Sequence, residues 1–186
     1  MTLIGKLVVA TAFATLCSVA HASDVHARID VNGIQGGIVL EGNDISAGGE
    51  SVNATWEKDE KKQNCQLVSY FIAGKEWKTG TFSFTPDKSG TVDIRVLGTH
   101  SNPSAWTLIT DIKATGTTLA NGDFKNGLAG WTLSNWVKDG SKATVVDGQT
   151  PDSKAIKVSH DNGVVQSVPV VGGQVVKITF SYKVAQ

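Results

Sequence analysis

The C-terminal segment Val176–Val184 alternates between apolar and polar residues without interruption, and this alternation limits the possible fold more than any other feature. A period of two with β-branched and aromatic enrichment is typical of a strand that buries one face. Thr91–Val96 has the same pattern and is predicted to form a second strand of this kind. The apolar positions of the first segment are Val176, Ile178, Phe180, Tyr182 and Val184, and the polar ones are Lys177, Thr179, Ser181 and Lys183.

Turn residues divide most of the remaining chain into short segments of strand length. The turns contain Asn-Gly, Asp-Gly, Gly-Gly or Pro-Asp-Lys-Ser-Gly, which supply the positive φ or the preset proline φ of a tight reversal. No amphipathic helix is apparent after the N-terminal segment. Roughly ten short strands at this spacing predict an all-β, antiparallel sandwich or barrel. The further strands expected are Ala27–Val31, Gly37–Glu41, Ser51–Glu57, Gln66–Ile72, Thr81–Thr85, Trp106–Ala114, Lys142–Val146, Ala155–Ser159 and Val164–Val168.

Residues 1–22 have the layout of a secretory signal peptide. Lys6 supplies a positive charge, Leu7–Val19 forms an apolar run, and Ala20-His21-Ala22 offers small residues at the cleavage positions. The alternatives are a buried helix or a membrane anchor, but the apolar run is shorter than the roughly 20 residues that span a bilayer. We therefore expect a secreted or periplasmic protein whose mature domain comprises residues 23–186.

The charge balance and the cysteines argue against several classes of protein. The chain has 17 basic and 17 acidic residues, and loss of Lys6 with the signal peptide leaves a slightly negative mature chain. A nucleic-acid-binding protein normally carries a basic surplus, so nucleic acid is not an expected partner. No later segment is long and apolar enough to predict a membrane span. Cys65 is then the only mature cysteine, which excludes an intrachain disulfide and favours a buried side chain over a reactive thiol.

Two segments carry motifs that occur together, in the opposite order, in one family of domains. Leu119–Trp131 reads LANGDFKNGLAGW, with Asn-Gly-Asp-Phe, Asn-Gly and Gly-Trp in succession. Trp77–Gly116 contains a Phe-x-Phe strand, a Ser-Gly turn, an alternating strand and a strand with Asp-Ile near its end. The first segment resembles the opening half, and the second the closing half, of carbohydrate-binding modules with the galactose-binding-like jelly roll.

The resemblance implies one jelly-roll β-sandwich whose halves, about residues 27–118 and 119–186, are circularly permuted. Gly116–Asn121 would join the two ordinary termini of the family, which is feasible because the termini of a domain often lie close together. Two incomplete tandem repeats are the alternative, although each would leave an unpaired edge and an exposed apolar face unless two chains exchange strands. Phe124 and Trp131 are expected in the core of either arrangement.

The same resemblance implies a non-catalytic module that binds a polysaccharide or glycan. Such modules stack exposed aromatic rings on pyranose faces, and neighbouring polar side chains bond the hydroxyl groups. Core burial is the alternative for each tryptophan. A structural or adhesion protein that binds a secreted or surface protein is the second functional hypothesis. The candidate site residues are Trp106, Trp136, Trp77, Asn102 and Asn135, with Trp56 as a further aromatic candidate.

A structural calcium ion is also implied by the resemblance. Asp111 matches an aspartate ligand of the family, whereas Lys125 stands at the position of its glutamate ligand. A lysine would repel Ca²⁺, so Asp123 would have to replace the glutamate among the six to eight oxygen ligands that this ion needs. An ion pair between Asp111 and Lys125 is the alternative.

The sequence contains no recognisable catalytic set. His100 and His160 lie in separate predicted loops, and no Ser-His-Asp set, zinc-ligand spacing or phosphate-binding loop accompanies them. We therefore do not expect an enzyme.

Overall fold

The computed structural model contains twelve strands and no helix in the residues that it describes, which are 25–33, 46–48, 51–59, 64–86, 88–99, 102, 104–135 and 140–186. For residues 33, 46–48, 51–59 and 64–69 only the backbone is described. The strands are β1 (His26–Gly33), β2 (Ser46–Gly48), β3 (Ser51–Asp59), β4 (Asn64–Ile72), β5 (Lys78–Phe84), β6 (Gly90–Leu97), β7 (Thr107–Thr115), β8 (Thr132–Asn135), β9 (Thr144–Asp147), β10 (Lys154–Val158), β11 (Asn162–Val170) and β12 (Val176–Val184).

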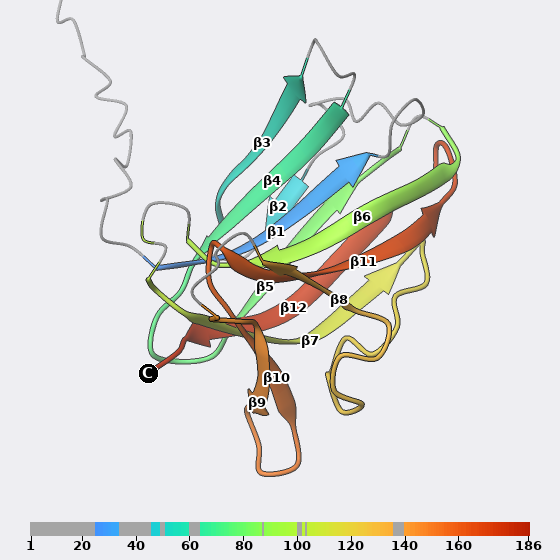
Figure 1. Cartoon of the computed structure of the whole chain (residues 1–186). Helices are drawn as coiled ribbons and strands as arrows, with labels where there is room; N and C mark the ends of the chain where they lie inside the picture. Colours follow the sequence, from blue (N-terminus) through green and yellow to red (C-terminus); the bar gives the residue numbers. More distant parts are fainter. Residues whose placement is uncertain are drawn as a thin grey trace, which may run out of the picture.

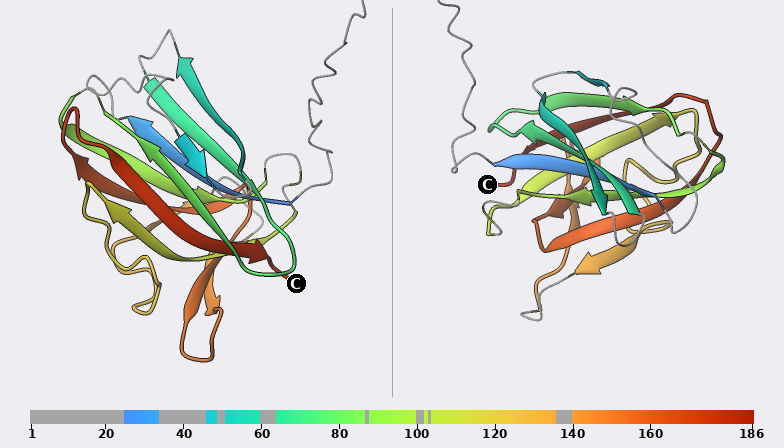
Figure 2. Two further views of the ribbon diagram at one scale, coloured as in Figure 1. Left: turned by 180° about the vertical axis from the view of Figure 1, so that it is seen from behind. Right: turned by 90° about the horizontal axis from the view of Figure 1, so that it is seen from above.

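These strands form two antiparallel six-stranded sheets packed as a β-sandwich (Figures 1 and 2). The first sheet has the strand order β3-β4-β1-β6-β11-β8, and the second has the order β2-β5-β12-β7-β10-β9. The predicted all-β sandwich is thereby confirmed. Every predicted strand within the described residues is present, with ends that differ by a few residues, and β2 and β8 lie outside the predicted ranges. The predicted strand Gly37–Glu41, the signal peptide and the Cys65 side chain lie outside the described part of the chain.

Both sheets combine strands from the front and the back of the chain. β12 lies between β5 and β7, and β11 lies between β6 and β8 (Figure 1). In the register of β12, Ile178 lies opposite Phe82 on one side and Ala114 on the other. The segment Val176–Val184 therefore belongs to the same two-sheet core as Phe82 and Val92–Val96. Circular permutation would produce such an arrangement, but the permutation itself stays a prediction.

The apolar side of β12 forms the centre of the core. Phe180 is 1% exposed, and its ring meets the ring of Phe71 edge to face, with the centroids 4.9 Å apart. Gly80 lies opposite Phe180 in β5. A Cβ atom at residue 80 would approach the Phe180 ring to 2.6 Å, so this close packing of two strands requires glycine. The alternation of β12 thus predicts its burial correctly, while its neighbours decide how tightly it packs.

Asn121 organises the 116–131 loop, which connects β7 to β8. Its Nδ2 donates hydrogen bonds to the carbonyl oxygens of Gly127 and Ala129, both at 3.0 Å, and its Oδ1 accepts one from the Asn126 N–H at 3.2 Å. The indole Nε1 of Trp131 donates to the Asn121 carbonyl oxygen at 3.1 Å. Trp131 is buried together with Phe124, as predicted, and one asparagine therefore fixes both the loop and a core tryptophan.

We expect Asn121→Gly to lower the free energy of unfolding by about 2 kcal/mol, because three hydrogen bonds worth roughly 0.5–1.5 kcal/mol each are lost. Asn121 has a φ of 49°, which glycine adopts without strain, so the change introduces no backbone strain into the folded state. Urea denaturation followed by tryptophan fluorescence measures the effect. Asn126→Gly is the matched control, since the Asn126 side chain is exposed. Equal stability losses in the two variants would contradict the role of Asn121.

Candidate functional site

Both sheets meet at the end of the sandwich where β1 begins, which we call the β1 end. The His26 carbonyl oxygen accepts a hydrogen bond from Thr107 Oγ1 at 3.0 Å, which ties the first residue of β1 to the first residue of β7 in the other sheet. The Gly98 N–H, after β6, donates to the Ser159 carbonyl oxygen, after β10, at 3.0 Å. β5 also begins, and β8 and β12 also end, at this end of the sandwich. Four of the five predicted site residues lie there: Trp77, Trp106, Asn102 and Asn135.

Trp77 and Trp106 occupy one face of the second sheet. Both side chains are half-buried, and each ring is covered by a lysine ammonium group 5.3 Å from its centroid, Lys183 over Trp77 and Lys157 over Trp106. Leu108 of β7 lies opposite Lys157 of β10 on one side and opposite Lys183 of β12 on the other. Since Phe180 and Tyr182 of β12 point into the core, Lys183 points outward. We call these five outward-facing residues, Trp77, Trp106, Leu108, Lys157 and Lys183, the Trp-Lys platform.

The Trp-Lys platform combines apolar rings with two positively charged groups. Each ammonium lies within the 6 Å range of a cation–π contact, which contributes roughly 0.5–1 kcal/mol at an exposed site. Within the part of the chain that the structure describes, no carboxylate lies within ion-pair distance of Lys157 or Lys183. The two lysines are separated by two strand spacings, about 10 Å. Such a surface suits a ligand with flat apolar faces and polar or charged edges.

The remaining predicted binding residues are not part of the Trp-Lys platform. Asn102 precedes Trp106 in a tight turn, where its carbonyl oxygen accepts the Ala105 N–H at 2.9 Å, and its side chain is half-buried. Trp136, the Trp56 side chain and His100 lie outside the described residues. Among the predicted polar residues, Asn102 is therefore the closest in sequence to a platform residue, Trp106.

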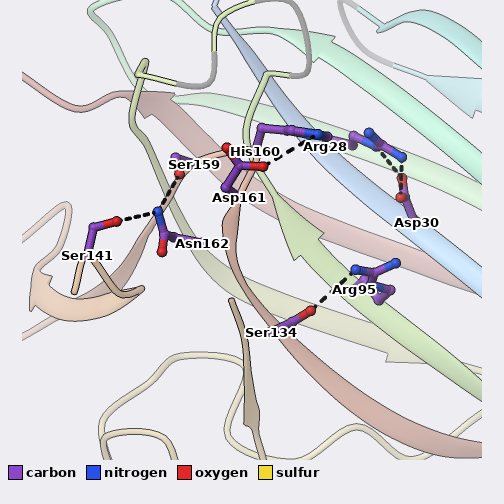
Figure 3. Close-up of polar contacts among 9 residues, drawn as sticks. All are labelled: Arg28, Asp30, Arg95, Ser134, Ser141, Ser159, His160, Asp161 and Asn162. Carbon is purple, nitrogen blue, oxygen red and sulfur yellow. Dashed lines mark hydrogen bonds and ion pairs between the residues drawn. The ribbon is translucent and has the colours of Figure 1, made fainter. Parts of the chain in front are cut away.

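Asn135 lies at the β1 end but belongs to the other sheet. It ends β8 opposite Asn162 of β11, and the amide oxygens of both residues are buried without a hydrogen-bond partner among the described residues. Asn162 Nδ2 donates to Ser141 Oγ at 3.0 Å and to Ser159 Oγ at 3.1 Å (Figure 3). Asn135 therefore lies opposite a separate polar cluster of Ser141, Ser159 and Asn162.

A charged cluster on the outer face of the first sheet was not predicted. Arg28 and Asp30 form two hydrogen bonds, Nε to Oδ1 at 2.7 Å and Nη2 to Oδ2 at 2.6 Å, and their side chains are 9% and 0% exposed (Figure 3). Arg28 also lies over the Tyr70 ring, 5.3 Å from its centroid. Arg95 donates to Ser134 Oγ at 3.3 Å. Burial lowers the pKa of Arg95, and the Asp30 carboxylate opposes that shift.

The cluster of Arg28, Asp30 and Arg95 carries charges of both signs on neighbouring strands. Arg28 is paired with Asp30, and Arg95 bonds Ser134 of the same sheet, so we assign the cluster a structural role. A signal for it exists in the sequence, because His26, Arg28, Asp30 and Asn32 share the face of β1 opposite the apolar residues of that strand. Alternation alone does not reveal that this polar face is buried.

The two aspartates predicted as calcium ligands lie on neighbouring segments. Asp111 has a φ of 51° at a β-bulge of β7, and the adjacent Ile112 N–H donates to the Gly122 carbonyl oxygen, next to Asp123, at 3.0 Å. Lys125 Nζ lies 3.9 Å from the Asp123 carboxylate. The ion pair of Lys125 is therefore formed with Asp123, whereas the alternative to calcium predicted one with Asp111.

Asp111 and Asp123 would supply only part of a calcium site. Two carboxylates, one of them beside a lysine, are fewer than the six to eight oxygen ligands that Ca²⁺ requires, so backbone oxygens would have to supply the rest. The described residues contain no group of three or more His, Cys, Asp or Glu side chains suited to hold a metal ion. Calcium binding stays a prediction, and no function is derived from it.

Comparison of the chain with protein-family models, curated proteins and solved structures found no match. No helix among the described residues is long and apolar enough to cross a membrane. The chemistry of the site is therefore the basis for a functional proposal.

Proposed function

We propose that the protein is a non-catalytic module that binds a polysaccharide or glycan through the Trp-Lys platform. The observation that carries this proposal is the pair of half-buried rings, Trp77 and Trp106, on one face and at one end of the same sheet. An indole ring offers a flat apolar surface that complements the apolar face of a pyranose. Lysine ammonium groups beside the rings supply donors for sugar oxygens.

Two further features support glycan binding. The motifs in Leu119–Trp131 and Trp77–Gly116 resemble carbohydrate-binding modules, and the antiparallel sandwich agrees with that resemblance. A secretory N-terminus, as the sequence predicts, would expose the protein to polysaccharides outside the cell. Because sandwiches host many unrelated functions, the platform supports the proposal more strongly than the fold does.

A glycan array followed by titration calorimetry tests this proposal. We expect Trp77→Ala and Trp106→Ala each to weaken binding of the best array ligand about tenfold or more, because an aromatic anchor at the centre of a binding surface commonly contributes above 1.4 kcal/mol. Leu133→Ala is the control, since Leu133 is exposed on the other sheet. Thermal unfolding confirms that each variant is folded.

Undiminished glycan affinity in the Trp77→Ala/Trp106→Ala variant would show that the platform is not the binding site. Failure of the folded protein to bind any glycan would contradict the proposed function. The adhesion hypothesis, in which the sandwich contacts another protein, would then take its place.

A further inference from the structure

We propose that the Trp-Lys platform selects acidic polysaccharides, whose sugars carry carboxylate or sulfate groups. This inference rests on the proposed function and names its ligand class. The first step concerns what already covers the two indole rings. Lys183 lies over Trp77 and Lys157 lies over Trp106, so each ring presents one face that is in contact with a cation.

A neutral sugar and an acidic sugar interact differently with a lysine-covered ring. A neutral sugar that stacks on the covered face must displace the ammonium group and receives only ordinary hydrogen bonds in return. An acidic group draws the ammonium to itself in a charge-assisted hydrogen bond, which is shorter and stronger, while the ring is freed for the pyranose face. The same movement of one lysine therefore uncovers the indole ring and pairs the ammonium group with the acidic group of the ligand.

The local charge favours the same ligand class. Neither Lys157 nor Lys183 has a carboxylate within ion-pair distance among the residues with described side chains. Lys113 and Lys177 lie on the same outer face further along β7 and β12, and both are exposed. The whole chain has equal numbers of basic and acidic residues, so the four lysines of this face do not reflect a general basic surplus. On the other sheet, by contrast, Arg28 is paired with Asp30.

The spacing of the cations favours a polymer over a single sugar. Lys157 and Lys183 lie on β10 and β12, on either side of β7, so their Cα atoms are about 10 Å apart. One monosaccharide acid cannot contact both ammonium groups and both rings at once. A chain with an acidic group on successive sugars can pair with each lysine and cover each ring.

Binding to three soluble polymers tests the inference: polygalacturonate, which carries carboxylates; dextran sulfate, which carries sulfates; and neutral dextran. We expect at least one acidic polymer to bind about tenfold more tightly than dextran at low salt, with the preference shrinking as NaCl screens the charges. Comparison of the two acidic polymers identifies which acid group is preferred. Lys157→Gln/Lys183→Gln should abolish the preference. Lys88→Gln/Lys125→Gln, which removes the same charge at exposed sites away from the platform, should retain it.

The possible failures are distinguishable. Tight binding of neutral glycans that depends on Trp77 and Trp106, without an acidic preference, would overturn this inference and leave the proposed function intact. Equal loss of acidic binding in both lysine pairs would show non-specific charge attraction and overturn it as well. Acidic binding that survives Trp77→Ala/Trp106→Ala would contradict the platform itself. Loss of acidic binding in that variant and in Lys157→Gln/Lys183→Gln, but not in the control pair, supports the inference.

Discussion

Asp30→Ala should lower the free energy of unfolding by about 3–5 kcal/mol, the usual effect of removing one partner from a buried ion pair. The Asp30 side chain is 0% exposed and accepts two hydrogen bonds from Arg28, whose own side chain is 9% exposed. Without the carboxylate, Arg28 loses two charge-assisted hydrogen bonds at a buried position. Chemical denaturation with a two-state fit measures the change.

The control for Asp30→Ala is the double variant Arg28→Met/Asp30→Leu. Replacing both charges with apolar side chains of similar size removes the buried Arg28 cation together with its partner, and such replacements are often neutral or stabilising. The double variant should therefore be markedly more stable than Asp30→Ala. A loss below about 1 kcal/mol in Asp30→Ala would mean that water reaches Arg28, since exposed ion pairs contribute only this much.

Phe180→Ala should destabilise the protein by about 3–5 kcal/mol through loss of apolar burial and formation of a cavity. The Phe180 ring packs against Phe71 of β4 and over Gly80 of β5, so the cavity would lie between the two sheets. Ser181→Ala, at the neighbouring outward-facing position, should change stability by less than about 0.5 kcal/mol. Unfolding curves followed by fluorescence and by far-UV circular dichroism measure both variants.

The Phe180→Ala experiment also tests whether the front and back strands unfold together. If β12 belongs to one cooperative core with β4 and β5, the two optical signals will shift by the same amount. A transition that splits into two steps, with the front strands unaffected by Phe180→Ala, would contradict the shared core.

The strands were predictable from the sequence because their pattern is local. The alternation in β6 and β12 predicts both their conformation and the buried face, and turn residues mark most of the other strand ends. β2 was missed, since a strand of three residues, Ser46–Gly48, offers too few positions for a period of two to be recognised. The β-bulge at Asp111 was also missed, because its positive φ depends on contacts with β12 and with the 116–131 loop.

The candidate site was predictable only in its parts. Trp77 and Trp106 are identifiable as aromatic candidates, but their position on one face depends on β12 lying between β5 and β7. The lysines that cover them are Lys157 of β10 and Lys183 of β12. No local sequence pattern connects either lysine to a tryptophan. Long-range strand order, set by packing of the whole sandwich, therefore creates the platform from residues that look unremarkable one at a time.

The most direct test of the platform is the indole ¹⁵N–¹H spectrum of the folded protein during titration with polygalacturonate. If the platform binds this polymer, the signals assigned to Trp77 and Trp106 will shift with ligand concentration. The signal of Trp131 should stay fixed, because Trp131 is buried and its Nε1 is bonded to the Asn121 carbonyl oxygen. Saturating complex formation that leaves the Trp77 and Trp106 signals unchanged would contradict glycan recognition by this platform.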